Sequence, residues 1–233
     1  MVGTFWRQTA VIADFLLNSF ATMLVTIDPI GLAPIFLAVT RGADPKIRRI
    51  IAVRASIIAA LILIAFAFIG SGILSFLGIS LPAFRIAGGL LLFWIAFEMV
   101  FEKRERRKQA SAEQALGHDK VDAAAAPRQH GPSNDDYRSL AVFPLAIPLI
   151  AGPGAISATI LIGSQTRGVA DQAALVGLLL GMTLLCFMVF IAADKLDRFL
   201  GETGRTVLTR LLGVLLAALA VQFVADGAKA IFM

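Results

Sequence analysis

Charged residues are scarce in this sequence, and long stretches contain none. Of its 233 residues 16% are charged and 58% are hydrophobic, and residues 102–138 alone hold 15 of the 37 charged side chains. Cysteine occurs once, at Cys186, and histidine twice. A lone cysteine excludes a disulfide scaffold, and the high apolar content excludes both a disordered chain and a water-soluble globule. These absences leave a helical membrane protein with several spans.

Uncharged runs predict six membrane spans. A helix needs about 20 mostly apolar residues to cross a hydrocarbon core about 30 Å thick. The segments that meet or approach this length are about 10–40, 52–76, 82–101, 139–163, 173–193 and 206–226. Several are apolar on every face instead of alternating, which favours helices over a β-barrel. The predicted fold class is an all-α membrane protein with six transmembrane helices.

Lysine and arginine are unequally divided between alternate loops. The segments 41–54, 102–138 and 194–205 together carry sixteen of them, against three on the opposite face. Since basic loops stay in the cytoplasm, this bias predicts that both termini lie outside. The net charge of +5 then implies no nucleic-acid partner.

Matching motifs divide the chain into two halves. Residues 29–34 (PIGLAP) in the first span resemble residues 148–153 (PLIAGP) in the fourth, and residues 85–91 resemble residues 210–216 in the third and sixth spans. Three spans per half turn the second half over relative to the first, as in many secondary transporters. The predicted divisions are a first inverted repeat at 1–101, a flexible cytoplasmic loop at 102–138 and a second repeat at 139–233.

Proline and glycine in the middle of spans one and four predict a break in each helix, because proline lacks a backbone donor and clashes with the preceding turn. Irregular backbone at membrane depth must be buried in protein or line a wet cavity, so the two breaks are expected to meet. Helix ends meeting there would offer donors and acceptors to a small zwitterion. The predicted substrate-binding residues are Asp28, Pro29, Gly31, Pro34, Gly152, Pro153, Gly154 and Ser157.

Asp28 has two interpretations. A charged aspartate at mid-bilayer costs about 2.5–3.5 kcal/mol, which favours binding of a coupling H+ or Na+ or of a substrate ammonium group. Asp28 also fits the N-cap of a second half-helix that starts at Pro29. Arg85 is either a snorkelling anchor or a gating or coupling residue. Glu98 and Asp226 lie near span ends and are expected at the membrane interface.

Enzymatic chemistry finds little support in the sequence. Both histidines, His118 and His130, lie in the polar loop, and no cluster has the spacing of metal ligands. The G-x4-G-K-[ST] loop of ATP-driven pumps is missing. We therefore predict no enzymatic activity, no metal and no cofactor other than a coupling H+ or Na+.

Three stretches resemble a known family. Residues 27–40 (IDPIGLAPIFLAVT), 78–99 (GISLPAFRIAGGLLLFWIAFEM) and 144–160 (PLAIPLIAGPGAISATI) are similar to the MarC family of integral membrane proteins, also called SnatA-like. The resemblance implies six spans in a prokaryotic cytoplasmic (inner) membrane. It also implies ion-driven transport of small neutral amino acids such as glycine or alanine. An exporter of another small solute and a non-transporting scaffold or regulator stay open as alternatives, as does a homo-oligomer.

Overall fold

The computed structural model describes residues 16–40, 43–101, 141–166 and 168–232, and within these ranges every regular element is a helix. The elements are helix 16–27, α2 (Pro29–Val39), α3 (Pro45–Phe76), α4 (Leu81–Val100), the π-helix η1 (Ala141–Ile150), α7 (Pro153–Gly163), α8 (Val169–Ile191) and α9 (Ala193–Phe232). The predicted all-α class is confirmed for this part of the chain. The loop predicted at 102–138 lies outside the described residues.

Five segments of the described chain are long and apolar enough to cross a membrane: Leu16–Val39, Pro45–Phe76, Leu81–Val100, Val169–Ile191 and Thr203–Phe232. The span predicted at 139–163 instead contains two short helices, η1 with 10 residues and α7 with 11. Neither reaches the length of a bilayer crossing alone. The structure thus supports a protein with several membrane-spanning helices, and the count of six stays a prediction.

Local sequence signals set several helix ends. α3 and α4 each carry proline in their first turn, where its missing N–H removes no helical bond. The Ser80 hydroxyl caps α4 by accepting from the Ala83 N–H at 3.3 Å. α3 starts at Pro45, earlier than the predicted 52, because this start signal precedes the apolar run and the basic residues continue the helix.

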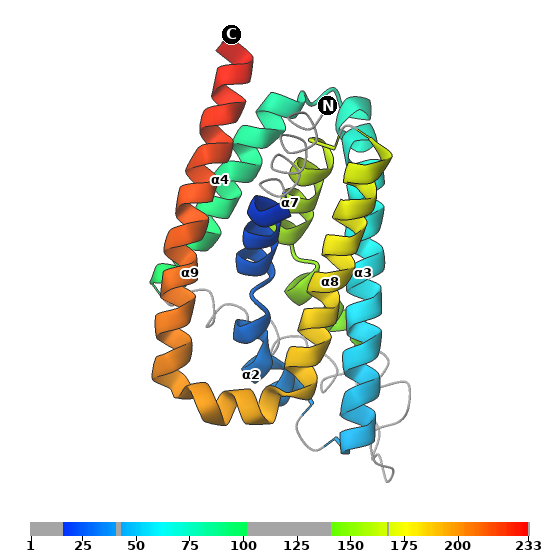
Figure 1. Ribbon diagram of the computed structural model, residues 1–233, viewed down its shortest axis with the longest axis vertical. Coiled ribbons are helices and arrows are strands. Elements are labelled where there is room, and N and C mark those ends of the chain that lie inside the picture. Colours follow the sequence, from blue (N-terminus) through cyan, green and yellow to red (C-terminus); the bar gives the residue numbers. More distant parts are fainter. Residues whose placement is uncertain (1–15, 41–42, 102–140, 167, 233) are drawn as a thin grey trace, which may run out of the picture.

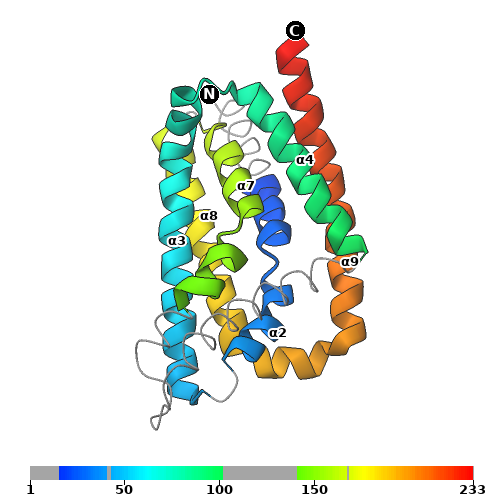
Figure 2. The same ribbon diagram turned by 180° about the vertical axis from the view of Figure 1, so that it is seen from behind.

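The helices form two flanking pairs with the interrupted segments between them. α3 packs against α8 on one flank, and α4 packs extensively against α9 on the other. Helix 16–27, α2, η1 and α7 lie between these flanks in both views (Figures 1 and 2). The aromatic rings of Phe36 and Phe190 stack at 4.5 Å and join α2 to α8. Contacts between the two predicted halves therefore hold the bundle together.

Glycines allow α4 and α9 to approach closely. A Cβ added to Gly89 would lie 2.9 Å from the Ala220 carbonyl oxygen, and one added to Gly213 would lie 3.1 Å from the Ala96 oxygen. Gly227 approaches the Pro82 oxygen in the same way, at 2.9 Å. Small residues at helix crossings give the tight packing on which membrane proteins depend. The α4–α9 pair is accordingly a closely packed flank.

The outward faces of the flanking helices are apolar. Exposed large side chains include Leu61, Phe68 and Ile69 of α3, Leu180 and Leu184 of α8, and Leu211, Val214 and Leu215 of α9. A water-soluble protein rarely exposes apolar surface on this scale. A lipid environment around the bundle accounts for it.

The prediction of a basic loop at 194–205 is wrong in part, because residues 193–200 are helical. At Gly201 the backbone takes φ 60°, ψ −178°, outside the helical region, and the chain turns there. The helix before Gly201 runs across one end of the bundle (Figure 1). There Arg48 and Asp194 form a salt bridge at 3.0 Å, which ties the start of α3 to this crossing helix.

Candidate functional site

A single residue, Asp28, separates helix 16–27 from α2. The Asp28 N–H still donates to the Leu24 carbonyl at 2.9 Å, but its φ of 56° and ψ of 65° lie in the left-handed region. Aspartate tolerates this region better than most residues, because its short side chain bonds to the nearby backbone. Pro29 then starts α2 at a position where its missing N–H costs nothing.

The Asp28 carboxylate caps α2. Its Oδ1 accepts from the Gly31 N–H at 3.1 Å, and the residue is only 2% exposed. A Cβ added to Gly31 would lie 2.8 Å from Asp28 Cγ and would overlap the carboxylate oxygens. Position 31 must therefore be glycine, because any side chain there would displace the Asp28 carboxylate from the cap. The capping interpretation of Asp28 matches the geometry, while its role toward an ion or a substrate stays a prediction.

A second interruption separates η1 from α7. The Ala151 N–H donates to the Ala146 carbonyl at 2.9 Å, and helical bonding resumes where the Ile156 N–H meets the Gly152 carbonyl at 2.9 Å. A Cβ at Gly152 would lie 2.5 Å from the Pro148 carbonyl oxygen, so the backbone passes too closely for any side chain. Glycine at the N-cap leaves the first turn of α7 without a side-chain cap.

The two interruptions are neighbours in space. A Cβ added to Gly154, directly after Pro153, would lie 3.2 Å from the Thr26 methyl, two residues before Asp28. One turn further along, the Thr159 hydroxyl lies 3.8 Å from the Met23 sulfur. α2 and α7 run away from this point toward opposite ends of the bundle (Figures 1 and 2). The N-termini of both helices therefore meet near the centre.

The other predicted site residues occupy the edges of this region. Pro34 lies inside α2 and is half-buried, whereas Pro153 is exposed at the start of α7. Ser157 is half-buried and faces α4, since a Cβ on Gly88 would lie 3.9 Å from Ser157 Cβ. The hydroxyl of Thr159 is used within its own helix, donating to the Ala155 carbonyl at 2.7 Å. The structure thus brings the residues next to the two interruptions close together, and it places Ser157 in the contact between α7 and α4.

Two charged residues of α4 lie apart from the interruptions. Arg85 is half-buried near α9, where its Cβ lies 3.2 Å from a Cβ added to Gly227, and its Nε has no hydrogen-bond partner among the described residues. Glu98 is only 6% exposed and accepts from the Trp94 indole N–H at 3.0 Å. Glu98 is thus covered within the bundle, and its location at the membrane interface stays a prediction.

A polar cavity between helix 16–27, α7 and α9 was not predicted from the sequence. It has a volume of about 400 Å³. Its lining residues are Asn18, Ser19, Thr22, Ile162, Gln165, Leu219, Gln222, Phe223 and Asp226. The available signal was the spacing of Asn18, Thr22 and Thr26, four residues apart, which places all three on one face of a predicted span.

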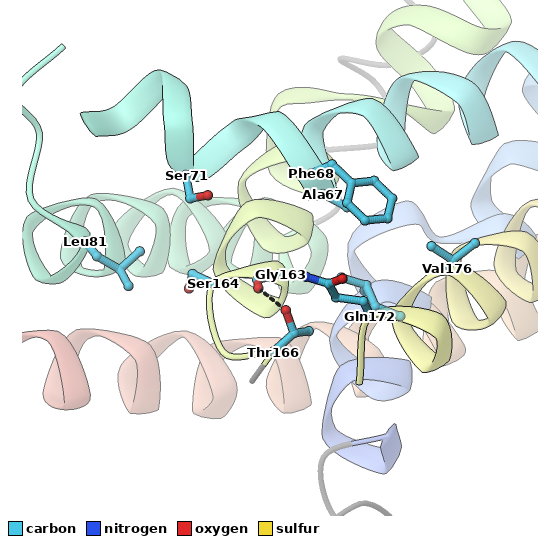
Figure 3. A pocket seen from close by; sticks show the side chains of 10 residues that line it. Ala67, Phe68, Ser71, Leu81, Gly163, Ser164, Thr166, Gln172 and Val176 are labelled. Carbon is cyan, nitrogen blue, oxygen red and sulfur yellow. Dashed lines mark hydrogen bonds between the residues drawn. The ribbon is translucent and has the colours of Figure 1, made fainter. Parts of the chain in front are cut away.

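A second cavity of about 260 Å³ lies where the ends of α3 and α7 meet the start of α8 (Figure 3). Two of the hydroxyl groups that line it form hydrogen bonds within the end of α7. The Thr166 hydroxyl donates to the Gly163 carbonyl at 2.7 Å, as Figure 3 shows, and the Ser164 hydroxyl donates to the Leu161 carbonyl at 2.7 Å. Such bonds are usual for hydroxyls near a helix end. The Ser164 and Thr166 hydroxyls therefore serve to end α7, and they give no sign of a binding role.

Comparison with known proteins identifies the family of this chain. A family model described as MarC family integral membrane protein matches residues 13–232. Proteins named UPF0056 membrane protein are similar over nearly the whole chain: one from Archaeoglobus fulgidus is 36% identical over 92% of both chains, and YhcE of Escherichia coli is 34% identical over 91% of both. One from Methanocaldococcus jannaschii is 32% identical over 93% of this chain and 97% of its own.

No solved structure matches the chain. The names of these relatives give a membrane protein and no reaction or substrate. The resemblance found in the sequence is confirmed, since the family model covers almost the full length. The chain belongs to the MarC family of integral membrane proteins.

Proposed function

We propose that the protein is a secondary transporter of small neutral amino acids such as glycine or alanine, driven by H+ or Na+ and working by alternating access. The observation that carries the proposal is the meeting of two interrupted segments in the middle of an apolar bundle, where Gly154 lies against Thr26. Interrupted helices whose N-termini point at the substrate are a recurring transporter design. Backbone of this kind has no evident purpose in a passive scaffold.

The two helix starts differ in a way that suits a zwitterion. At α2 the Asp28 carboxylate occupies the first turn, whereas α7 begins with Gly152 and has no side-chain cap. Uncapped amide groups at the start of α7 can receive a substrate carboxylate. The buried Asp28 carboxylate can receive an ammonium group or the coupling cation. A glycine or alanine molecule spanning the gap would satisfy both.

An inverted repeat forms part of this proposal. The two helices that start at the interruptions, α2 and α7, each have 11 residues and begin with proline, at Pro29 and Pro153. Pro29 and Pro153 are 124 residues apart, close to the 125 residues between Arg85 and Arg210. The matched motifs at 29–34 and 148–153 are only 119 residues apart and agree less well. Matching helices of the two halves also pair with each other, α3 with α8 and α4 with α9. In this register Gly152 corresponds to Asp28.

We further propose that the broken segments and their neighbours make six crossings of a prokaryotic cytoplasmic membrane, with both termini outside. The basic starts of α3 and the crossing helix 193–200 lie at one end of the bundle, and the C-terminus lies at the other (Figure 1). The positive-inside rule assigns the basic end to the cytoplasm. Alternating access then requires movement of the α4–α9 flank relative to the α3–α8 flank around the central segments.

Reconstitution tests the function directly. Purified protein in liposomes is given labelled glycine or alanine, with and without an imposed pH or Na+ gradient. Gradient-dependent uptake that saturates and is competed by unlabelled amino acid supports the proposal. Absence of flux for every amino acid in a panel refutes it, and a parallel panel of other small solutes then distinguishes an exporter of another solute from a scaffold.

A further inference from the structure

The cavity between helix 16–27, α7 and α9 lies on the side of the interruptions away from the basic end. Gln222 and Asp226 line it from the second half of α9, whose C-terminus marks that end of the bundle. Its volume of about 400 Å³ lies within the range of small-molecule sites. The wall from helix 16–27 is polar, with Asn18 and Thr22, while Ile162 and Phe223 are apolar.

Asp226 is the only charged residue among those that line this cavity in the described chain. It is partly buried and accepts from the uncharged Gln222 amide at 2.9 Å. It lies six residues before Phe232, about 9 Å along the helix. A carboxylate that lines a cavity among amides and hydroxyls can receive a cationic group.

Hydroxyl groups continue from the cavity toward the interruptions. Thr22 lines the cavity, and Thr26 follows one turn later on the same face of helix 16–27. The Thr26 Oγ1 donates to the Thr22 carbonyl at 2.6 Å, and its methyl lies against Gly154. Thr22 is six residues from Asp28, about 9 Å along the helix axis. The cavity is thus about 9 Å, along the axis of helix 16–27, from the interruption at Asp28.

We propose that this cavity is the outer substrate vestibule, in which Asp226 binds the ammonium group of an amino acid before it reaches the interruptions. The inference rests on the transport function proposed above and adds a second site to it. The amide group of Asn18 serves the substrate carboxylate, and Ile162, Leu219 and Phe223 accept a small apolar side chain. Asp226 here is a binding residue and takes no part in the central site.

Transport kinetics test the role of Asp226. Asp226→Asn keeps size and hydrogen bonding but removes the charge, so the KM for externally added alanine should rise about tenfold with little change in maximal rate. Asp194→Asn is the matched control, because it removes a carboxylate at the opposite end of the bundle. Methylamine should compete in the wild type and acetate should compete weakly. An unchanged KM in Asp226→Asn, or competition by acetate but not by methylamine, overturns the proposal.

Cysteine labelling gives a readout that does not depend on transport. Cys186 is the sole cysteine and is buried, so an introduced surface cysteine is selectively labelled. Gln165→Cys places a thiol in the vestibule, and Gln172→Cys places one in the second cavity. A membrane-impermeant thiol reagent should label both, and alanine should slow labelling only at the vestibule. Equal labelling rates with and without alanine at Gln165→Cys refute the vestibule.

The two proposals fail in different ways. Wild-type protein that moves no amino acid refutes the transport function. If the wild-type protein transports, either wild-type kinetics in Asp226→Asn or absence of substrate protection at Gln165→Cys refutes the vestibule and leaves the transport function standing. If Asp226→Asn does not fold, the labelling experiment still tests the vestibule, because the Gln165→Cys protein retains Asp226.

Discussion

Asp28 caps α2, and under the proposed function it also binds an ion or the substrate; different substitutions can separate these two roles. Asparagine keeps the acceptor that caps Gly31 and tolerates the left-handed backbone, but it carries no charge. Alanine removes the charge and the cap, and it fits the backbone poorly. Comparison of Asp28→Asn with Asp28→Ala therefore divides the contribution of Asp28 to stability from its contribution to ion or substrate binding.

The structure gives the size of each effect. Loss of an N-cap costs about 1 kcal/mol, and a left-handed conformation costs a residue with a plain Cβ about 1–2 kcal/mol. Asp28→Ala should thus destabilise the protein by about 2–3 kcal/mol, which lowers a melting temperature by roughly 2–4 °C for each kcal/mol. Asp28→Asn should change the melting temperature little, because the hydrogen bond to the Gly31 N–H at 3.1 Å can persist.

Two measurements on the same preparations test this reasoning. Thermal unfolding in detergent should rank the variants as wild type and Asp28→Asn together, with Asp28→Ala well below. Gradient-driven alanine uptake in liposomes should be strongly reduced in both variants, since both lack the charge. Wild-type uptake by Asp28→Asn would show that the carboxylate serves only as a cap. An Asp28→Ala protein as stable as the wild type would refute the capping geometry itself.

Three further experiments test the packing of the bundle. Gly31→Ala should push the Asp28 carboxylate off its cap and destabilise by about 1–3 kcal/mol, whereas Gly72→Ala, where an added Cβ meets nothing within 4 Å, should be neutral or slightly stabilising in the same melting assay. Gly89→Ala should separate α4 from α9 at a cost of about 1–3 kcal/mol, seen as a lower melting temperature and slower flux. Removal of the Arg48–Asp194 pair, tested as a double-mutant cycle, should yield a coupling of about 0.2–1 kcal/mol that falls with salt, because both groups are solvent-exposed in part.

Composition and periodicity predict much of the fold, because lipid restricts the options to helices of bilayer length. The apolar segments of α3, α4, α8 and α9 follow from their uncharged runs. The start signals at Pro29 and Pro153 are also visible in the sequence, since proline strongly prefers the first turn of a helix. The short crossing helix of residues 193–200 was not predicted, because its charged residues resemble those of a loop.

Which proline starts a helix could not be predicted from the motif alone. The match of residues 29–34 with residues 148–153 pairs Pro29 with Pro148, yet α7 starts at Pro153, and Pro148 lies inside η1. The choice depends on the close approach of Gly152 to the Pro148 carbonyl, which is a three-dimensional fact. Burial of Glu98 likewise depends on the neighbouring helices, and the polar cavity around Asp226 needs three segments distant in sequence.

Under the proposed function, the difference between the two helix starts explains how an inverted repeat would bind an asymmetric solute. Two identical starts would offer two anion sites if uncapped, or none if both carried a carboxylate, and neither arrangement orients a zwitterion. With Asp28 at one start and Gly152 at the other, one end of the site is negative and the other presents free amides. The two ends stay distinct because a Cβ at Gly152 would collide with the Pro148 carbonyl, so no capping side chain fits there without moving the backbone. An approximately symmetric scaffold can in this way hold a substrate in a single orientation.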